Sequence, residues 1–141
     1  QAFTNMLYCM YHAKENKEGK PVKYPWLYEE LAQKPGCTQD FKEEWQLLRF
    51  QVGGKLFAAV CKDEQGEDAL LTVKLDPAEG QFLRGQYEDI IPGYYMNKDH
   101  WNSIRLDGAV PDQLLREMAE KSYQLVLGGL SKKKQKEILG Q

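Results

Sequence analysis

The sequence predicts one α+β domain in which an antiparallel sheet packs against helices. Apolar and polar residues alternate in successive short runs between residues 48 and 74, which is the pattern of strands with one buried face. A long amphipathic helix is predicted over 111–127, and shorter helices before and between the strands. Helices before, within and after a run of strands are typical of α+β layers. A chain of 141 residues fits a single domain of this kind.

The N-terminal segment is predicted to stand apart from this domain. Apolar residues recur at helical spacing over 1–13, and a charged stretch with glycine and proline follows. We therefore expect an added helix and linker over 1–24, and the main domain over 25–141. The helix is a candidate surface for a protein partner or for self-association. The lysines of the charged stretch are candidates for a local positive patch, and they are Lys14, Lys17, Lys20 and Lys23.

The first elements of the main domain are a short helix and a hairpin. Pro25 suits the first turn of a helix that runs through Leu31, and Lys34-Pro35-Gly36 ends it. Gly53-Gly54 then joins two strands, because both glycines can take a positive φ in a tight turn. The residues predicted to share the buried face are Leu48, Phe50 and Val52 on the first strand, and Leu56, Ala58 and Val60 on the second.

A third strand is predicted over 69–74, with Leu71 and Val73 continuing the alternation. Asp76, Pro77 and Glu79 then have the spacing of a capping box, so a helix should begin there and carry Phe82 and Leu83 inward. A loop is predicted over 90–93, and a strand over 102–106 with Ile104 and Leu106 on its buried face.

The helix over 111–127 has an apolar stripe that should cover the sheet, and Gly128-Gly129 ends it. The predicted stripe comprises Leu114, Leu115, Met118, Ala119, Ser122, Leu125 and Val126.

One segment, Tyr94 to Gly108, is unusually rich in aromatic and amide side chains. Together with Lys34-Pro35-Gly36, the hairpin over 52–58 and Ser122-Tyr123, it resembles the MmcQ/YjbR family, small bacterial domains with a CyaY-like fold. The resemblance runs from near Trp26 to about Leu139. It implies a two-layer α+β fold, and it implies DNA binding, because the family is described as DNA-binding.

This segment also supplies the candidate binding residues. An exposed cation, an imidazole and an indole can together meet a phosphate and a stacked base. The alternative is structural: Asn97 caps a turn, Trp101 anchors the loop on the core, and His100 satisfies a backbone carbonyl. The candidates are Tyr94, Tyr95, Asn97, Lys98, His100, Trp101 and Arg105.

A second candidate for phosphate contacts is the lysine run after Ser131, where a last helix would begin. Cations there oppose the positive end of the helix macrodipole. Either this helix is frayed and only solvated, or an anionic partner compensates the charge. The lysines are Lys132, Lys133, Lys134 and Lys136.

Composition limits the partners. The net charge of −2 and a pI near 5.8 argue against a generally basic surface, so nucleic-acid binding requires a local patch. No apolar run approaches the ~18 residues of a membrane span. The three cysteines, Cys9, Cys37 and Cys61, are odd in number and far apart, which favours neither disulfides nor zinc and fits a reducing cytoplasm.

The sequence carries no assembled catalytic motif, and we expect neither an enzyme nor a cofactor. Cys37, with His100 as its base, is the one nucleophile to consider, although a single cysteine and a single histidine are more often structural. No metal site is expected, and we interpret the acidic residues Glu29, Glu30, Asp40, Glu43 and Glu44 as a solvated face.

We therefore expect a non-enzymatic protein that binds nucleic acid through phosphates, and we keep as the alternative a protein-interaction or small-ligand module with an aromatic groove.

Overall fold

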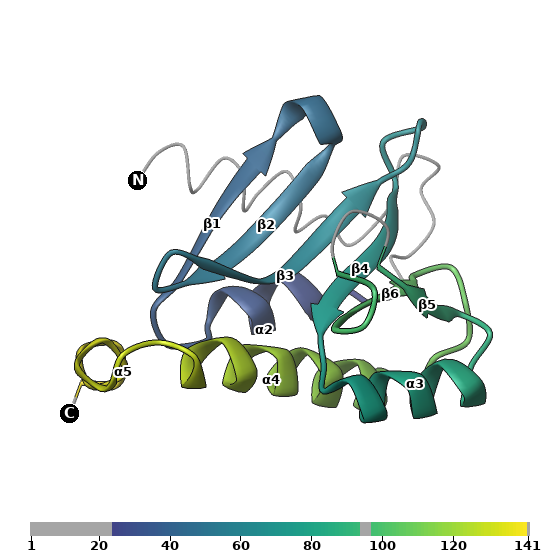
Figure 1. The fold of residues 1–141 in the computed structure, drawn as a ribbon. Coiled ribbons are helices and arrows are strands. Elements are labelled where there is room, and N and C mark those ends of the chain that lie inside the picture. Colours follow the sequence, from purple (N-terminus) through teal and green to yellow (C-terminus); the bar gives the residue numbers. More distant parts are fainter. Residues whose placement is uncertain (1–23, 94–96, 141) are drawn as a thin grey trace.

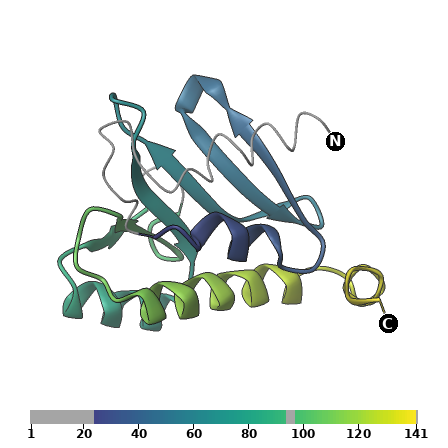
Figure 2. The same ribbon diagram turned by 180° about the vertical axis from the view of Figure 1, so that it is seen from behind.

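The computed structural model of the chain describes residues 24–93 and 97–140. They form a six-stranded antiparallel sheet in the order β1-β2-β3-β4-β6-β5, with helices on one face. Figure 1 and Figure 2 show α2 and α4 against that face and α5 lying across the end of α4. The predicted α+β class is therefore confirmed. The predicted N-terminal helix and most of its linker lie outside the described residues.

The first half of the fold is a meander, as predicted. Helix α2 (Leu27–Ala32) precedes strands β1 (Cys37–Lys42), β2 (Leu47–Val52), β3 (Lys55–Lys62) and β4 (Asp68–Lys74), each paired antiparallel with the next. A short 3-10 helix, η1 (Glu43–Trp45), lies between β1 and β2. Gly53 and Gly54 have φ values of 57° and 78°, which confirms the predicted tight turn.

The second half adds α3 (Pro77–Gln86), β5 (Ile90–Pro92), β6 (Trp101–Arg105), α4 (Asp112–Gly128) and α5 (Lys132–Leu139). The Asp76 side chain accepts a hydrogen bond from the backbone N–H of Ala78, so the predicted cap is present. Glu79 pairs with Lys121 of α4. No helix among the described residues is long and apolar enough to cross a membrane.

The core lies between the sheet and the helices. Leu48, Phe50, Val52, Leu71, Val73 and Ile104 are all at most 1% exposed, as their alternation predicted. A bulge after Phe50 changes the facing residues of β3, so Phe57 enters the core and Leu56 does not. The predicted inward position of Leu56 is therefore wrong.

Five further points of the sequence analysis need correction. The sequence did not predict β1, because its polar residues obscure the alternation, and the expected loop over 90–93 contains strand β5. Phe82 points outward and is 64% exposed, and Leu125 is 43% exposed. Tyr123 and Leu127 occupy the buried face of α4 in addition to the predicted stripe.

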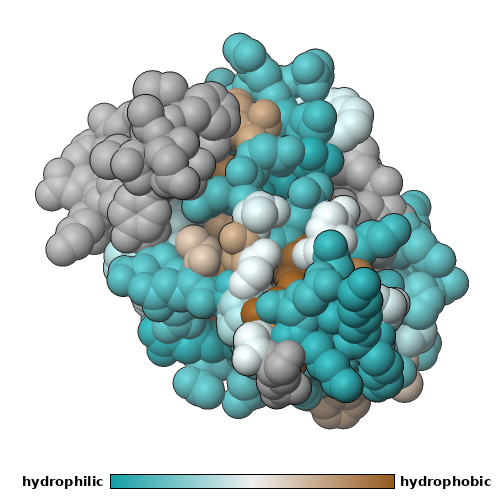
Figure 3. Space-filling model, turned by 90° about the vertical axis from the view of Figure 1, so that its left-hand side faces the viewer, coloured by the Kyte–Doolittle hydropathy of each residue, from teal (hydrophilic) through white to brown (hydrophobic). Residues whose placement is uncertain are grey.

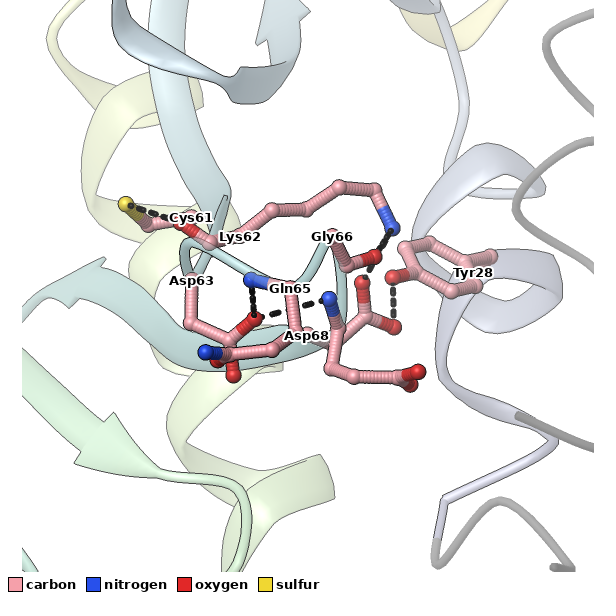
Figure 4. Close-up of polar contacts among 8 residues, drawn as sticks. Tyr28, Cys61, Lys62, Asp63, Gln65, Gly66 and Asp68 are labelled. Carbon is pink, nitrogen blue, oxygen red and sulfur yellow. Dashed lines mark hydrogen bonds and ion pairs between the residues drawn. The ribbon is translucent and has the colours of Figure 1, made fainter. Parts of the chain in front are cut away.

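Polar contacts hold the loop between β3 and β4 in place (Figure 4). The Lys62 ammonium lies 2.9 Å from a carboxylate oxygen of Asp68 and donates to the Gly66 carbonyl at 3.3 Å. The Tyr28 hydroxyl of α2 donates to the other Asp68 oxygen. The Asp63 carboxylate accepts from two backbone N–H groups of the same loop. The loop is therefore tied both to itself and to the helical layer.

Candidate nucleic-acid interface

The strand register gathers several lysines at one end of the sheet. Val52 pairs with Lys55 across the hairpin turn, and Lys74 pairs with Trp101 at the same end of the adjoining strands. The Asn97–His100 turn immediately precedes Trp101, so it lies at this end too. We call this region, completed by α5, the lysine end of the molecule. Its lysines are Lys55, Lys74, Lys98, Lys132, Lys133, Lys134 and Lys136.

Two glycine turns make room for α5. A Cβ on Gly53 would come within 2.5 Å of the Leu130 side chain, and a Cβ on Gly36 within 2.8 Å of Ile138. Leu130 therefore packs against the β2–β3 turn, and Ile138 against the turn before β1, at distances that leave no room for a side chain on either glycine. Figure 3 shows this side of the molecule, where hydrophilic side chains surround a small apolar hollow. Apolar contact thus fixes α5 against the lysine end of the sheet.

The docked helix directs its lysines outward. With 100° of rotation per residue, Lys132, Lys133 and Lys136 lie on the side of α5 opposite Ile138. The four α5 lysines are exposed, whereas Gln135 and Ile138 are half-buried. The expectation of a frayed segment is wrong, because Ser131 caps the helix by accepting a hydrogen bond from the Lys134 N–H at 3.1 Å.

The electrostatics of α5 are unfavourable in isolation. Its first turn contains no acidic residue, and its lysines begin at the first helical position. Positive side chains near an N-terminus repel the partial positive charge of the helix, each at a cost of about 0.3–1 kcal/mol when exposed. Within the described chain, no carboxylate lies within ion-pair distance of these lysines. An anion would relieve this repulsion.

In the Asn97–Trp101 turn, Asn97 has the capping role that the structural alternative predicted. The Asn97 side chain accepts from the Asp99 N–H at 2.8 Å, and its backbone carbonyl accepts from the Trp101 N–H at 2.9 Å. Trp101 is half-buried, and its carbonyl accepts from Gly93 at 2.8 Å. Asn97 therefore caps the turn, and backbone hydrogen bonds of Trp101 tie the turn to Asn97 and Gly93. Tyr94 and Tyr95 lie outside the described residues.

His100 contributes its backbone to the fold. Its carbonyl oxygen accepts from the Leu75 N–H at 2.8 Å and from the Asn102 side chain at 3.2 Å. Among the described residues its ring nitrogens make no hydrogen bond, so the expected bond from the ring to a backbone carbonyl is absent there. Lys98, two residues earlier in the same turn, is exposed.

The structure separates the remaining candidates. Arg105 is exposed and pairs with Leu70 near the opposite end of β6, where its N–H donates to the Asp89 carbonyl. It is therefore remote from Lys98 and from α5. Lys55 and Lys74 were missing from the sequence-based set. Lys55 follows the Gly53-Gly54 turn, and Lys74 ends a predicted strand. These positions were the signal that would have placed both lysines at the same end of the sheet as the other candidates.

Cys37 and His100 do not form a catalytic pair. Cys37 begins edge strand β1, and His100 precedes β6, so four strand spacings, roughly 19 Å, lie between them. Burial raises the pKa of the Cys37 thiol to about 12. The thiol is therefore protonated at neutral pH and has no imidazole beside it.

The five acidic residues expected on a solvated face have mixed environments. Glu30 contacts Arg116, and Asp40 contacts Arg49 in an ion pair whose hydrogen bond lowers the pKa of the carboxyl group. Glu43 and Glu44 are exposed, as predicted. In the described part of the chain, no three His, Cys, Asp or Glu side chains are placed as metal ligands.

The fold and its lysine end define a small α+β protein with an exposed cationic face. The family model described as YjbR matches residues 32–125, and the chain belongs to that family. The matched range includes Lys55, Lys74 and Lys98 and ends before α5. The family match therefore does not cover α5 and its lysines, which are described for this chain only.

Known relatives agree with this assignment. The uncharacterised protein YjbR of Escherichia coli K12 is 33% identical over 103 residues, which is 73% of this chain and 86% of that protein. A crystal structure of a Deinococcus radiodurans protein with the domain DUF419 is 34% identical, with a TM-score of 0.71, over 79% of this chain and 84% of that one. A Pseudomonas syringae crystal structure with a TM-score of 0.61 covers 79% of this chain and 98% of its own at 20% identity, and it supports the fold alone.

Proposed function

We propose that this protein binds nucleic acid through its lysine end, by contacts to phosphates, and performs no catalysis. The observation that carries the proposal is the set of four exposed α5 lysines without carboxylate partners in the described chain, on a helix docked at the same end of the sheet as Lys55, Lys74 and Lys98. Lys and Arg that neutralise phosphates release condensed counterions, and this release supplies most of the non-specific affinity.

Charge distribution explains how a chain with a net charge of −2 can act in this way. The hairpin tips opposite the lysine end carry Glu43, Glu44, Asp63 and Glu64, all exposed. Repulsion between these carboxylates and phosphate would turn the lysine end toward the nucleic acid. The net negative charge of the chain then limits the affinity for nucleic acid. The uneven distribution of charge still sets the orientation in which the protein binds.

The described residues favour duplex over single strands. Binding of unpaired bases usually relies on exposed aromatic rings as stacking platforms. Trp101 is half-buried, so it is a poor platform. We therefore expect phosphate contacts to dominate, with the four α5 lysines alone giving a salt slope near about −3.6 on duplex DNA.

The test is fluorescence anisotropy of labelled single- and double-stranded DNA at about 50 and 200 mM salt. The native chain should bind duplex at the lower salt concentration and lose most of that binding at the higher one. The Lys133→Ala/Lys136→Ala variant should bind more weakly with a shallower salt slope. The matched control, Lys42→Ala/Arg105→Ala, removes two cations at the opposite end of the sheet and should bind like the native chain.

Lys98→Ala tests whether the Asn97–His100 turn takes part in binding. We expect this variant to lose less duplex affinity than the double α5 variant. Absence of binding at about 50 mM salt would contradict the proposal. Equal losses from the α5 and control pairs would show that net charge alone decides binding, and would contradict it as well.

A further inference from the structure

We propose that Trp45 and the carboxylates around it dock on the lysine end of a second copy, so that the chain associates head to tail. The Trp45 indole lies at the tip of the β1–β2 hairpin and is 63% exposed. Exposed tryptophans of this kind are over-represented among the residues that dominate protein–protein binding energy. Nucleic-acid binding does not explain this side chain, because it lies at the end remote from α5.

The backbone around Trp45 is held in a fixed conformation. Gln46 has a φ of 49°, a left-handed conformation that is uncommon for residues other than glycine. Its side-chain amide donates to the Glu43 carbonyl at 3.0 Å, and its own carbonyl accepts from the Lys62 N–H at 3.0 Å. The hairpin tip is therefore bonded to the end of β3, and Trp45 is presented on a rigid support. A rigid anchor loses little conformational entropy on binding.

Negative charge surrounds the indole. Glu43 and Glu44 precede it in η1, and the Gln46–Lys62 bond brings the β3–β4 loop with Asp63 and Glu64 alongside. Two backbone N–H groups hold the Asp63 carboxylate at 2.9 Å each (Figure 4). None of these four carboxylates takes part in an ion pair within the described chain. We call Trp45 with these carboxylates the acidic tip.

The complement to the acidic tip is on the same molecule, at the opposite end of the sheet. Lys132, Lys133 and Lys136 project from α5 without carboxylate partners among the described residues. A lysine ammonium placed over an indole face adds cation–π attraction to the ion pairs. Because one chain carries both surfaces at different places, the second copy satisfies the charge of each end, and the contact is heterologous.

A contact of this size should be weak and sensitive to salt. One tryptophan and a few charged side chains bury less than the roughly 1,000 Å² of a stable complex. Screening at about 0.1 M salt limits exposed charge pairs to about 10 Å. Association should therefore require low salt and high protein concentration. It uses the same lysines as the proposed nucleic-acid contact, so duplex DNA should compete with it.

The experiment is sedimentation velocity of the full chain without nucleic acid, comparing low salt with about 0.2 M salt. The native chain should show a mass that rises with concentration at low salt only, and Trp45→Ala should remain monomeric. Trp45 is exposed, so this variant should fold, which circular dichroism checks.

Charge reversal gives the sharper result. Glu43→Lys/Glu44→Lys cancels the net negative charge of the acidic tip, and Lys132→Glu/Lys133→Glu/Lys136→Glu removes most of the net positive charge of the lysine end. Each variant alone should be monomeric, and an equal mixture of the two should associate. The matched control Glu88→Lys/Glu117→Lys changes two exposed acids elsewhere and should associate like the native chain. Association that survives both reversals, or a native chain that stays monomeric at low salt, would overturn the proposal, whatever the outcome of the DNA-binding assays.

Discussion

Five ion-paired cations of the sheet and helical layer differ from the lysines of α5 in what they contact. Arg49 joins β2 to β1, and Lys62 joins the two ends of the β3–β4 loop. Lys34, Arg116 and Lys121 connect α4 to the turn before β1, to α2 and to α3. The α5 lysines have no such partners in the described chain. The paired cations fix relative positions of elements, and the α5 lysines remain available to an anion.

The largest effect should follow from reversing charge on α5. In Lys132→Glu/Lys133→Glu/Lys136→Glu, the loss of three phosphate contacts predicts about a 100-fold or greater loss of duplex affinity. The free energy of unfolding should stay constant or rise slightly, because acids near a helix N-terminus are favourable. Anisotropy and urea unfolding measure the two quantities. A clear drop in stability with unchanged affinity would reverse the comparison.

A smaller loss should follow from releasing α5 while keeping its charge. Ile138→Ala with Leu130→Ala removes the apolar contacts with the glycine turns, and an eight-residue helix is not stable alone. The lysines then lose their fixed positions, and we expect about a tenfold loss of affinity, near 1.4 kcal/mol. Hydrogen exchange should show faster exchange in α5 only. The control Leu139→Ala truncates an exposed side chain of the same helix and should change neither measurement.

Removing a paired cation should lower stability and leave duplex affinity unchanged, which is the opposite of what the α5 charge reversal should do. The Arg116 guanidinium lies 4.2 Å from the Trp26 ring centre and 2.9 Å from a Glu30 oxygen. Arg116→Ala should lower the free energy of unfolding by about 1–2 kcal/mol and leave duplex affinity unchanged. Arg105→Ala, which removes an exposed cation, is the comparison for the urea titration. If Arg116→Ala weakens DNA binding as much as the α5 variants do, the distinction fails.

The smallest effect concerns pH. The hydrogen bond from Arg49 holds the pKa of Asp40 below its usual value. A carboxyl group with a depressed folded-state pKa stabilises the fold above its unfolded pKa, about 3.9, and loses that contribution as the pH falls through the folded value. Native protein should therefore exceed Asp40→Asn in stability from neutral pH down to about 4, with the difference shrinking below it. A difference that stays constant on further acidification would exclude this ion pair as the cause.

Sequence patterns predicted the elements in which periodicity and turn chemistry agree. The Gly53-Gly54 hairpin, the Asp76 cap and the long α4 all follow from local rules, and each is present. Edge strand β1 was missed because its residues are mostly half-exposed and polar, so it has no clean alternation. The inversion at Leu56 and Phe57 depends on a bulge, which only strand pairing defines.

The candidate site likewise depends on strand pairing and packing, which local sequence patterns do not predict. Lysines adjacent in sequence were visible as a run, but Lys55 and Lys74 join them only through the antiparallel register. Arg105 was grouped with Lys98 because both belong to the Tyr94–Gly108 segment, whereas strand β6 carries Arg105 to the other end of the sheet. Docking of α5 depends on close approach to Gly36 and Gly53, distant positions whose meeting no local pattern indicates.

The most direct measurement is an NMR titration of the isotope-labelled Trp45→Ala chain, which should stay monomeric, with short duplex DNA at low salt. The account predicts amide shifts concentrated on α5, at Lys55 and at the Asn97–Trp101 turn, with the tips of the β1–β2 and β3–β4 hairpins unchanged. Shifts centred on Glu43–Trp45, or none at all at saturating DNA, would contradict it.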